Sequence, residues 1–112
     1  MIKMTLLIAR KPGMSVEEFR EYWGTTHLKA VASVPESKVS RGYRQQHNTY
    51  VVPDHTAAAP FDGIAEAWYD SIEDAMTFIN SDGWWNIIKR DDLNFIDITK
   101  TQIMLSEERR FD

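Results

Sequence analysis

The segment that says most about the fold reads Gly63-Ile64-Ala65-Glu66-Ala67-Trp68-Tyr69-Asp70-Ser71-Ile72-Glu73-Asp74. Its first part is apolar and aromatic apart from Glu66, which predicts a strand over residues 63–69. Ser71 follows, with acidic side chains two and three positions later, as is typical of a capped helix start. Apolar residues at 75, 78 and 79 keep helical spacing, so a helix begins here.

The same plan occurs 56 positions earlier, where Ser15-Val16-Glu17-Glu18 opens another helix. Its serine and last glutamate have the spacing of a capping box, in which each side chain satisfies a free backbone N–H. The apolar positions that follow predict a helix over about 15–31. The apolar segment 2–10 predicts the strand before it.

Three further segments complete the pattern. Residues 42–52 predict a polar strand, residues 83–92 a short additional helix, and residues 98–106 the last strand. The order is β-α-β, then β-α-β with one helical insertion, within one domain spanning residues 1–112. It predicts a ferredoxin-like α+β fold, with a four-stranded antiparallel sheet and both long helices on one face.

Two of the predicted strands carry apolar side chains on both faces. Strand 2–10 has Leu7 and Ala9 on its second face. Strand 63–69 has apolar residues at both odd and even positions, and therefore on both faces. Helices can cover only one face, and a large exposed apolar patch usually marks a partner surface. We therefore expect an obligate homodimer in which two sheets pack face to face.

Composition narrows the classes of function. The chain has 112 residues, a net charge of −4 and no cysteine, which excludes thiol catalysis, disulfides and thiolate metal sites. The acidic balance argues against nucleic-acid binding, which needs clustered Lys and Arg. The apolar run near the N-terminus is too short for a secretory signal or a membrane span. We expect a cytoplasmic protein with no membrane partner.

Three blocks of the sequence resemble the EthD-domain family, in the order that the family has them. They are residues 11–27, which open with Lys-Pro-Gly-Met-Ser, residues 61–71, and residues 94–97. The resemblance implies the dimeric α+β barrel superfamily, in which two ferredoxin-like subunits face each other through their sheets. That superfamily includes cofactor-independent monooxygenases, muconolactone isomerases, polyketide dehydratases and cyclases, and haem enzymes. The resemblance therefore implies the fold more closely than the reaction.

His27 is the leading candidate for a catalytic residue. It lies four residues after Trp23 and eight after Phe19, on the helix face that packs toward the sheet. An imidazole beside aromatic walls can act as general acid or base, whereas a histidine near a helix C-terminus can also be purely structural. Its match to the family histidine favours catalysis. Tyr22 and Trp23 are predicted to bind substrate.

The other two histidines say less about function. His47 shares a strand face with Tyr43 and Gln45, and this polar face either lines a wet cavity or faces solvent. We count it among the substrate-binding candidates. His55 lies in a loop and is expected to be exposed. The two histidines lack a third ligand at a recognisable spacing, so no zinc site is predicted.

Aromatic residues supply the candidate pocket walls, and any one of them can instead simply fill the core. Trp68, Trp85 and Phe95 are predicted to bind substrate. Trp84 and Trp85 lie on the inserted helix, which can close one end of a pocket as a lid. Glu66 shares a strand face with Trp68, so it either pairs with an arginine across the dimer or faces a cavity.

These features favour a small enzyme that acts on an aromatic or polyketide-like compound without a tightly bound organic cofactor. His27 would move a proton at an acidic carbon, a step that serves isomerisation, dehydration, cyclisation or oxidation. The alternative is a non-catalytic dimer that binds a hydrophobic metabolite or supports a partner enzyme, because no complete catalytic constellation is visible. Haem binding is a more distant third hypothesis.

Overall fold

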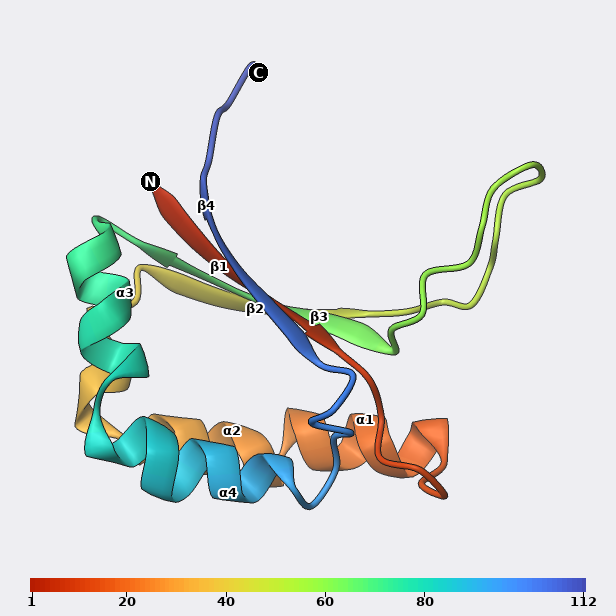
Figure 1. Ribbon diagram of the computed structural model, residues 1–112, viewed down its shortest axis with the longest axis horizontal. Helices are drawn as coiled ribbons and strands as arrows, with labels where there is room; N and C mark the ends of the chain where they lie inside the picture. Colours follow the sequence, from red (N-terminus) through yellow and green to blue (C-terminus); the bar gives the residue numbers. More distant parts are fainter.

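The computed structural model describes residues 1–112 and shows one sheet with all helices on the same side (Figure 1). Each strand is antiparallel to its neighbours, in the order β2-β3-β1-β4. The strands are β1 (Ile2–Ile8), β2 (Gly42–His47), β3 (Gly63–Tyr69) and β4 (Gln102–Glu107). The predicted ferredoxin-like α+β fold is confirmed, and β3 has the bounds that the sequence predicts.

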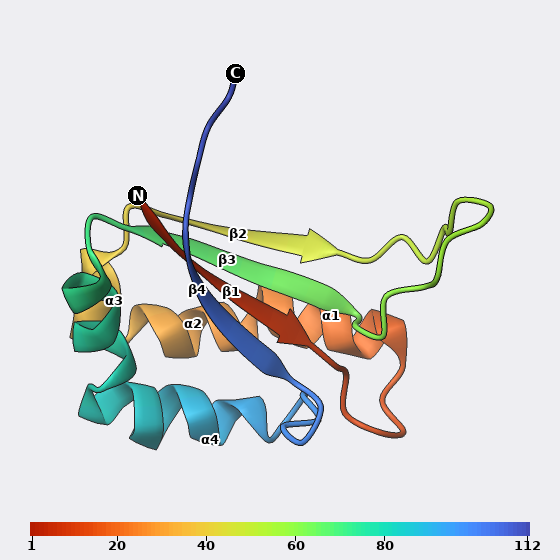
Figure 2. The same ribbon diagram turned by 45° about the horizontal axis from the view of Figure 1, so that its top comes forward.

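Four α-helices and two other helical turns form the second layer (Figures 1 and 2). The helices are α1 (Val16–Gly24), α2 (Thr26–Ala32), α3 (Ile72–Ile79) and α4 (Lys89–Asp92); the turns are the 3-10 turn η1 (Pro35–Val39) and the π-helical turn η2 (Trp84–Ile88). The predicted capping box of α1 is present, with both Ser15–Glu18 hydrogen bonds at 3.0 Å. No helix combines the length and the apolar character that a membrane crossing requires.

The helix predicted over residues 15–31 is two helices, because the chain bends at Thr25. Thr25 has φ −126° and ψ −80°, outside the helical region. Its hydroxyl donates to the Glu21 carbonyl at 2.6 Å, a local bond of the kind that bends helices. Trp23 and His27, on either side of the bend, are both buried.

Two predicted strand boundaries are wrong by four residues or more, and β1 also ends at Ile8 rather than at residue 10. Strand β2 ends at His47 rather than continuing to residue 52, and residues 48–62 leave the sheet as a long excursion that we call the arm (Figure 1). Tyr50 in the arm has φ 62°, which is not a strand conformation. Strand β4 begins at Gln102 rather than near residue 98, since Asp97 organises a turn by accepting the Thr99 N–H at 3.0 Å.

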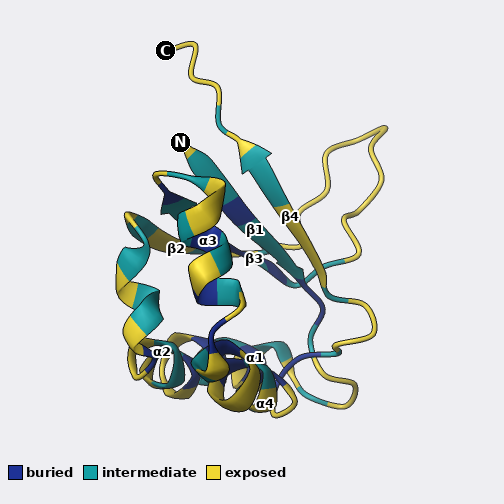
Figure 3. Cartoon of the chain, turned by 60° about the vertical axis from the view of Figure 1, so that its left-hand side comes forward, coloured by how far each residue is buried: buried dark blue, intermediate teal, exposed yellow.

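The two faces of the sheet differ in character. The helix-facing side forms much of the core, including Met4, Ile8, Ala65, Ala67 and Tyr69 (Figure 3). The opposite side, the open face, is mixed rather than apolar. It carries Leu7, Ile64, Trp68 and Met104 together with the ion pair of Lys3 and Glu66. Glu66 therefore lies on the open face, where Gln46 also donates to it at 2.8 Å.

Candidate functional site

A cavity of about 260 Å³ lies between the helices and the helix-facing side of the sheet. Strand β3 contributes Ala65 and Ala67, whose small side chains leave space above the sheet. Trp23, Trp84 and other apolar side chains form most of the remaining lining. The titratable groups that line it are His27, Tyr43, Tyr69, Lys89 and Asp92. An apolar chamber with a few polar groups is typical of a site for a small organic ligand.

One side of the His27 ring is fixed by Asp91. The Nδ1 atom of His27 lies 2.8 Å from Asp91 Oδ2, and the Tyr22 hydroxyl donates to Asp91 Oδ1 at 2.5 Å. Burial opposes ionisation of Asp91, but hydrogen bonds from Tyr22, His27 and Asn94 outweigh it and leave its pKa below the ordinary value. An ionised carboxylate can only accept, so Nδ1 carries the proton and Nε2 of the neutral ring has the free lone pair.

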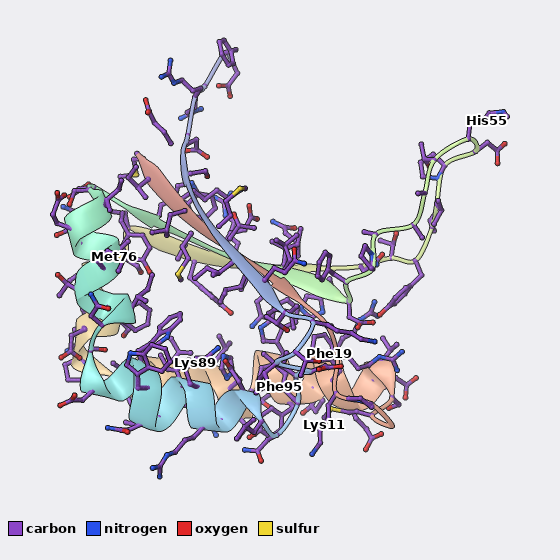
Figure 4. All side chains as sticks on the ribbon, in the orientation of Figure 1. Lys11, Phe19, His55, Met76, Lys89 and Phe95 are labelled. Atoms are coloured by element: carbon purple, nitrogen blue, oxygen red, sulfur yellow. The ribbon has the colours of Figure 1, made fainter.

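The other side of the ring faces a second carboxylate. Asp92 Oδ1 lies 3.9 Å from His27 Nε2, and Asp92 Oδ2 lies 3.3 Å from Lys89 Nζ. Burial raises the pKa of Asp92, against the opposing charges of His27 and Lys89. Both His27 and Asp92 line the cavity, and Figure 4 shows Lys89 on the helical layer below the sheet. The basic nitrogen therefore lies on the side of the ring where Asp92 borders the cavity.

Two other polar groups in the cavity walls have no hydrogen-bond partner, namely the Tyr69 hydroxyl and Trp23 Nε1. Both residues are fully buried. Burial raises the pKa of Tyr69 to about 12, so its hydroxyl stays protonated and is available as a donor. An unpaired buried donor costs about 1–3 kcal/mol of stability, and a ligand with an acceptor atom at this position would remove that cost.

Four of the predicted site residues come together around this cavity. His27 and Trp23 line it. Phe95 packs behind the histidine, with ring centroids 4.6 Å apart, and Tyr22 packs on Phe95 at 5.1 Å. His47 stacks on the outer side of Trp23 at 4.7 Å and does not itself line the cavity.

Trp68 and Trp85 lie elsewhere. Trp68 is on the open face, where its Nε1 donates to Glu108 at 3.0 Å, because successive strand residues alternate between faces. Trp85 is 57% exposed, whereas Trp84 is buried and lines the cavity. Adjacent residues of a helical turn point in different directions, so only one of this pair can face the sheet.

Sequence reasoning missed Asp91, Asp92 and Tyr69. The two aspartates follow Lys89 and Arg90, and such a charged run is usually a solvated helix face. One signal was available, since Asp92 lies four positions after the buried Ile88, on the same helix side. Nothing local marks Tyr69, whose hydroxyl is notable only for lacking a partner. No group of three or more His, Asp or Glu side chains is arranged to hold a metal ion.

Known proteins share both sequence features and fold with this chain. A family model of the EthD domain matches residues 11–99. An EthD family protein from Bacillus halodurans has a solved structure with a TM-score of 0.71 and 19% identity, covering 97% of this chain and 99% of that one. A search of curated proteins finds no match.

Two more distant solved structures share the fold. A protein of unknown function from Bacteroides fragilis, described as dimeric with a ferredoxin-like fold, has a TM-score of 0.64 at 14% identity and covers 96% of this chain and 95% of its own. A proposed antibiotic biosynthesis monooxygenase from Nitrosomonas europaea has a TM-score of 0.60 at 10% identity. The match covers 96% of this chain and 98% of that one. At these identities the likeness concerns the fold alone.

Proposed function

Since the chain belongs to the EthD family, we propose that it is a small-molecule enzyme that moves a proton on an aromatic or polyketide-like compound. The reaction takes place in the cavity beside His27. The observation that carries this proposal is the bond between His27 Nδ1 and Asp91 Oδ2 at 2.8 Å, at the wall of a mostly apolar chamber. It fixes the tautomer in which Nε2 is the base.

The proposed step breaks a C–H bond next to a carbonyl group. His27 Nε2 takes the proton, and the electron pair of the bond moves onto the carbonyl oxygen to give an enolate. The unpaired Tyr69 hydroxyl supplies a hydrogen bond to that oxygen. Asp91 stabilises the imidazolium, which then returns the proton to another atom of the compound or to a departing hydroxyl group. Return elsewhere gives isomerisation, and loss of water gives dehydration.

The remaining predicted residues have distinct parts in this proposal. Trp23 offers a flat wall to a planar ring, and Trp84 does so from the inserted helical segment. Tyr22 and Phe95 act as positioning residues, because they hold Asp91 and the histidine ring from behind. His47 supports Trp23 by stacking. Trp68 and Trp85 have no part in substrate binding here.

We further propose that the working unit is a homodimer formed through the open faces. This face carries Leu7, Ile64 and Met104, of which Met104 is 54% exposed. Helices cover only the other side of the sheet (Figure 2). The description of the Bacteroides fragilis neighbour as dimeric supports the pairing.

The proposal is tested by proton exchange, which needs no knowledge of the complete reaction. The protein is incubated in D₂O with aryl ketones such as 2-tetralone, and loss of the proton next to the carbonyl is followed by NMR. We expect His27→Ala to slow the catalysed exchange by on the order of a hundredfold or more. The exposed His55 serves as the matched control, and His55→Asn is expected to exchange at the parent rate.

Binding is measured separately by tryptophan fluorescence, with Ala67→Leu as a variant that fills the cavity. We expect it to abolish both binding and exchange. Ketones that bind without exchanging would favour the alternative of a non-catalytic binding dimer. Equal exchange by the parent protein and by His27→Ala would remove His27 from the mechanism.

A further inference from the structure

Two segments that the proposed reaction does not use leave the sheet on its open side (Figures 1 and 2). One is the arm, residues 48–62, whose tip includes the labelled His55 (Figure 4). The other is the C-terminal segment, residues 108–112, in which Phe111 is 96% exposed. Both project away from the helices, toward the space that a partner sheet would occupy. A phenylalanine so exposed lacks any apolar partner within its own chain.

The arm borders an open, mostly apolar pocket of about 430 Å³ on the open face. Leu7 and Ile64 of the sheet form one wall. The arm supplies the other walls, with Val51, Val52, Pro53, Ala57, Ala58 and Ala59. The base of the arm is held in place, because Asn48 Nδ2 donates to the Phe61 carbonyl at 2.8 Å and the Tyr50 hydroxyl donates to Asp62 at 2.7 Å. The two ends of the arm are therefore tied to each other beside the sheet.

The arm and the C-terminal segment start from diagonal corners of the sheet. Strands β2 and β4 are its two edges. The arm leaves β2 at the end where His47 pairs with Gly63, and the C-terminal segment leaves β4 at the end where Glu107 pairs with Ile2. Six residue steps of about 3.3 Å and three strand spacings of about 4.8 Å separate these corners by roughly 25 Å.

Phe111 does not fill the pocket of its own chain, since it is 96% exposed and is not among the residues that line the pocket. It lies four residues beyond Glu107, and four extended residues span at most about 14 Å. Leu7, the pocket wall on the strand next to β4, is five residue steps and one strand spacing from Glu107, or roughly 17 Å. We therefore consider a Phe111 that comes from a second molecule.

A second copy of this chain can deliver it by symmetry. A two-fold axis that runs between two facing sheets, perpendicular to the diagonal joining the arm corner and the C-terminal corner, exchanges the arm corner of one copy with the C-terminal corner of the other. The strands of the two sheets then cross steeply, which is one of the two common ways that sheets pack. Each arm then lies over the partner's C-terminal segment, so the contact forms twice and the assembly closes as a dimer.

We propose that Phe111 of each copy occupies the pocket under the arm of the other copy. This inference rests on the homodimer proposed above and names the segments that hold the two copies together, namely the arm and the C-terminal segment. It gives the exposed phenylalanine and the apolar pocket one common explanation. It also links the dimer contact to the reaction cavity, because His47 lines the arm pocket and stacks on Trp23.

Cysteine cross-linking tests this arrangement cleanly, since the chain has no cysteine of its own. One chain carries Ala58→Cys in the arm pocket, and a second chain carries Asp112→Cys beside an intact Phe111. The two are mixed, allowed to exchange subunits and oxidised mildly. We expect a disulfide-linked dimer containing one chain of each kind, because a disulfide forms only when the two Cα atoms are within about 7 Å. A control pair replaces Ala58→Cys with Ile72→Cys on exposed α3 and is expected to stay uncross-linked.

A third pair adds Phe111→Ser to the chain that carries Asp112→Cys, and we expect the cross-link to be lost. Ultracentrifugation separates the failure of this inference from the failure of the homodimer. A stable dimer that cross-links no better than the Ile72 control would overturn the exchange of Phe111 and leave the homodimer standing. A monomer would overturn both. Cross-linking that survives Phe111→Ser would show that Phe111 does not fasten the contact.

Discussion

The imidazole of His27 lies between two carboxylates that differ in their hydrogen bonding. Asp91 accepts bonds from Tyr22 and His27, and these bonds hold its pKa below the ordinary value despite burial. Asp92 is 7% exposed and has Lys89 as its main partner, and burial raises its pKa. One aspartate therefore fixes the ring, while the other is a partly compensated charge beside the cavity. Such a charge is retained at the expense of stability.

We predict that Asp92→Asn stabilises the protein at neutral pH. A carboxyl group with a raised pKa in the folded state contributes most to stability below its unfolded pKa, and that contribution is lost as pH rises through its folded pKa. Asparagine keeps the shape without the charge. We expect a gain of about 0.5–2 kcal/mol at pH 7, the size that single stabilising substitutions give.

Urea unfolding at pH 7 and pH 4 measures the effect, since the gain must shrink as the pH falls and Asp92 of the parent protein becomes protonated. Asp82→Asn, at an exposed position, is the control and is expected to show no such gain at either pH. A variant less stable than its parent at pH 7 would show that the ion pair with Lys89 outweighs the burial of Asp92.

Strand β3 and helix α1 meet so closely that glycine is needed at the contact. A Cβ added to Gly63 would lie 2.5 Å from Trp23 Cζ3 and 3.0 Å from the Gln46 carbonyl. The indole that fills this space also walls the cavity. By contrast, a Cβ added to Gly24 at the end of α1 would meet nothing within 4 Å.

We predict that Gly63→Ala destabilises the fold by about 1–3 kcal/mol, the usual size for overpacking, and displaces Trp23. Thermal unfolding and the emission of the buried tryptophans measure the two effects. Gly24→Ala is the matched control and is expected to leave stability unchanged or to raise it slightly, because alanine favours the helix. Equal stabilities for the two variants would contradict the close contact at Gly63.

The sequence predicted the presence of helices and strands more accurately than the residues at which they begin and end. Caps and apolar spacing located β3 and the start of α1 because both signals are local. The bend at Thr25 and the end of β2 at His47 escaped prediction. The bend accompanies a bond from the Thr25 hydroxyl to the Glu21 carbonyl, which apolar spacing does not reveal. The end of β2 depends on a distant partner, because Arg20 Nη2 donates to the Asn48 carbonyl at 2.6 Å where the arm begins.

At the scale of the whole molecule, the sheet is covered by helices on one side only (Figure 3). Leu7, Ile64 and Met104 remain on the other side around the ion pair of Lys3 and Glu66. A surface of this mixed kind is compatible with a protein interface, whose overall composition is close to that of the rest of a protein surface. The homodimer is proposed from this uncovered face and from the dimeric neighbour with the same fold.

We predict a dimer of about 26 kDa, twice the 13.0 kDa chain, in light scattering at micromolar concentration. Met104→Asp places an unpaired charge in the proposed interface and is expected to weaken the dimer by at least about a hundredfold. The control is Ile72→Asp at the first turn of α3, where an acidic side chain is favourable. A parent protein of 13.0 kDa would overturn the homodimer.

The sequence by itself determined the order of strands and helices, the capped helix starts, and the placing of Trp23 and His27 on one inward face. These follow from local backbone preferences and from the periods of strand and helix, which neighbouring residues encode directly. Only the tertiary structure decided that Asp91 holds His27, that Trp84 rather than Trp85 meets the cavity, and that the Tyr69 hydroxyl is left unpaired. Those outcomes depend on how elements far apart in the chain rotate and pack against one another. The spacing of residues along the chain does not encode that packing.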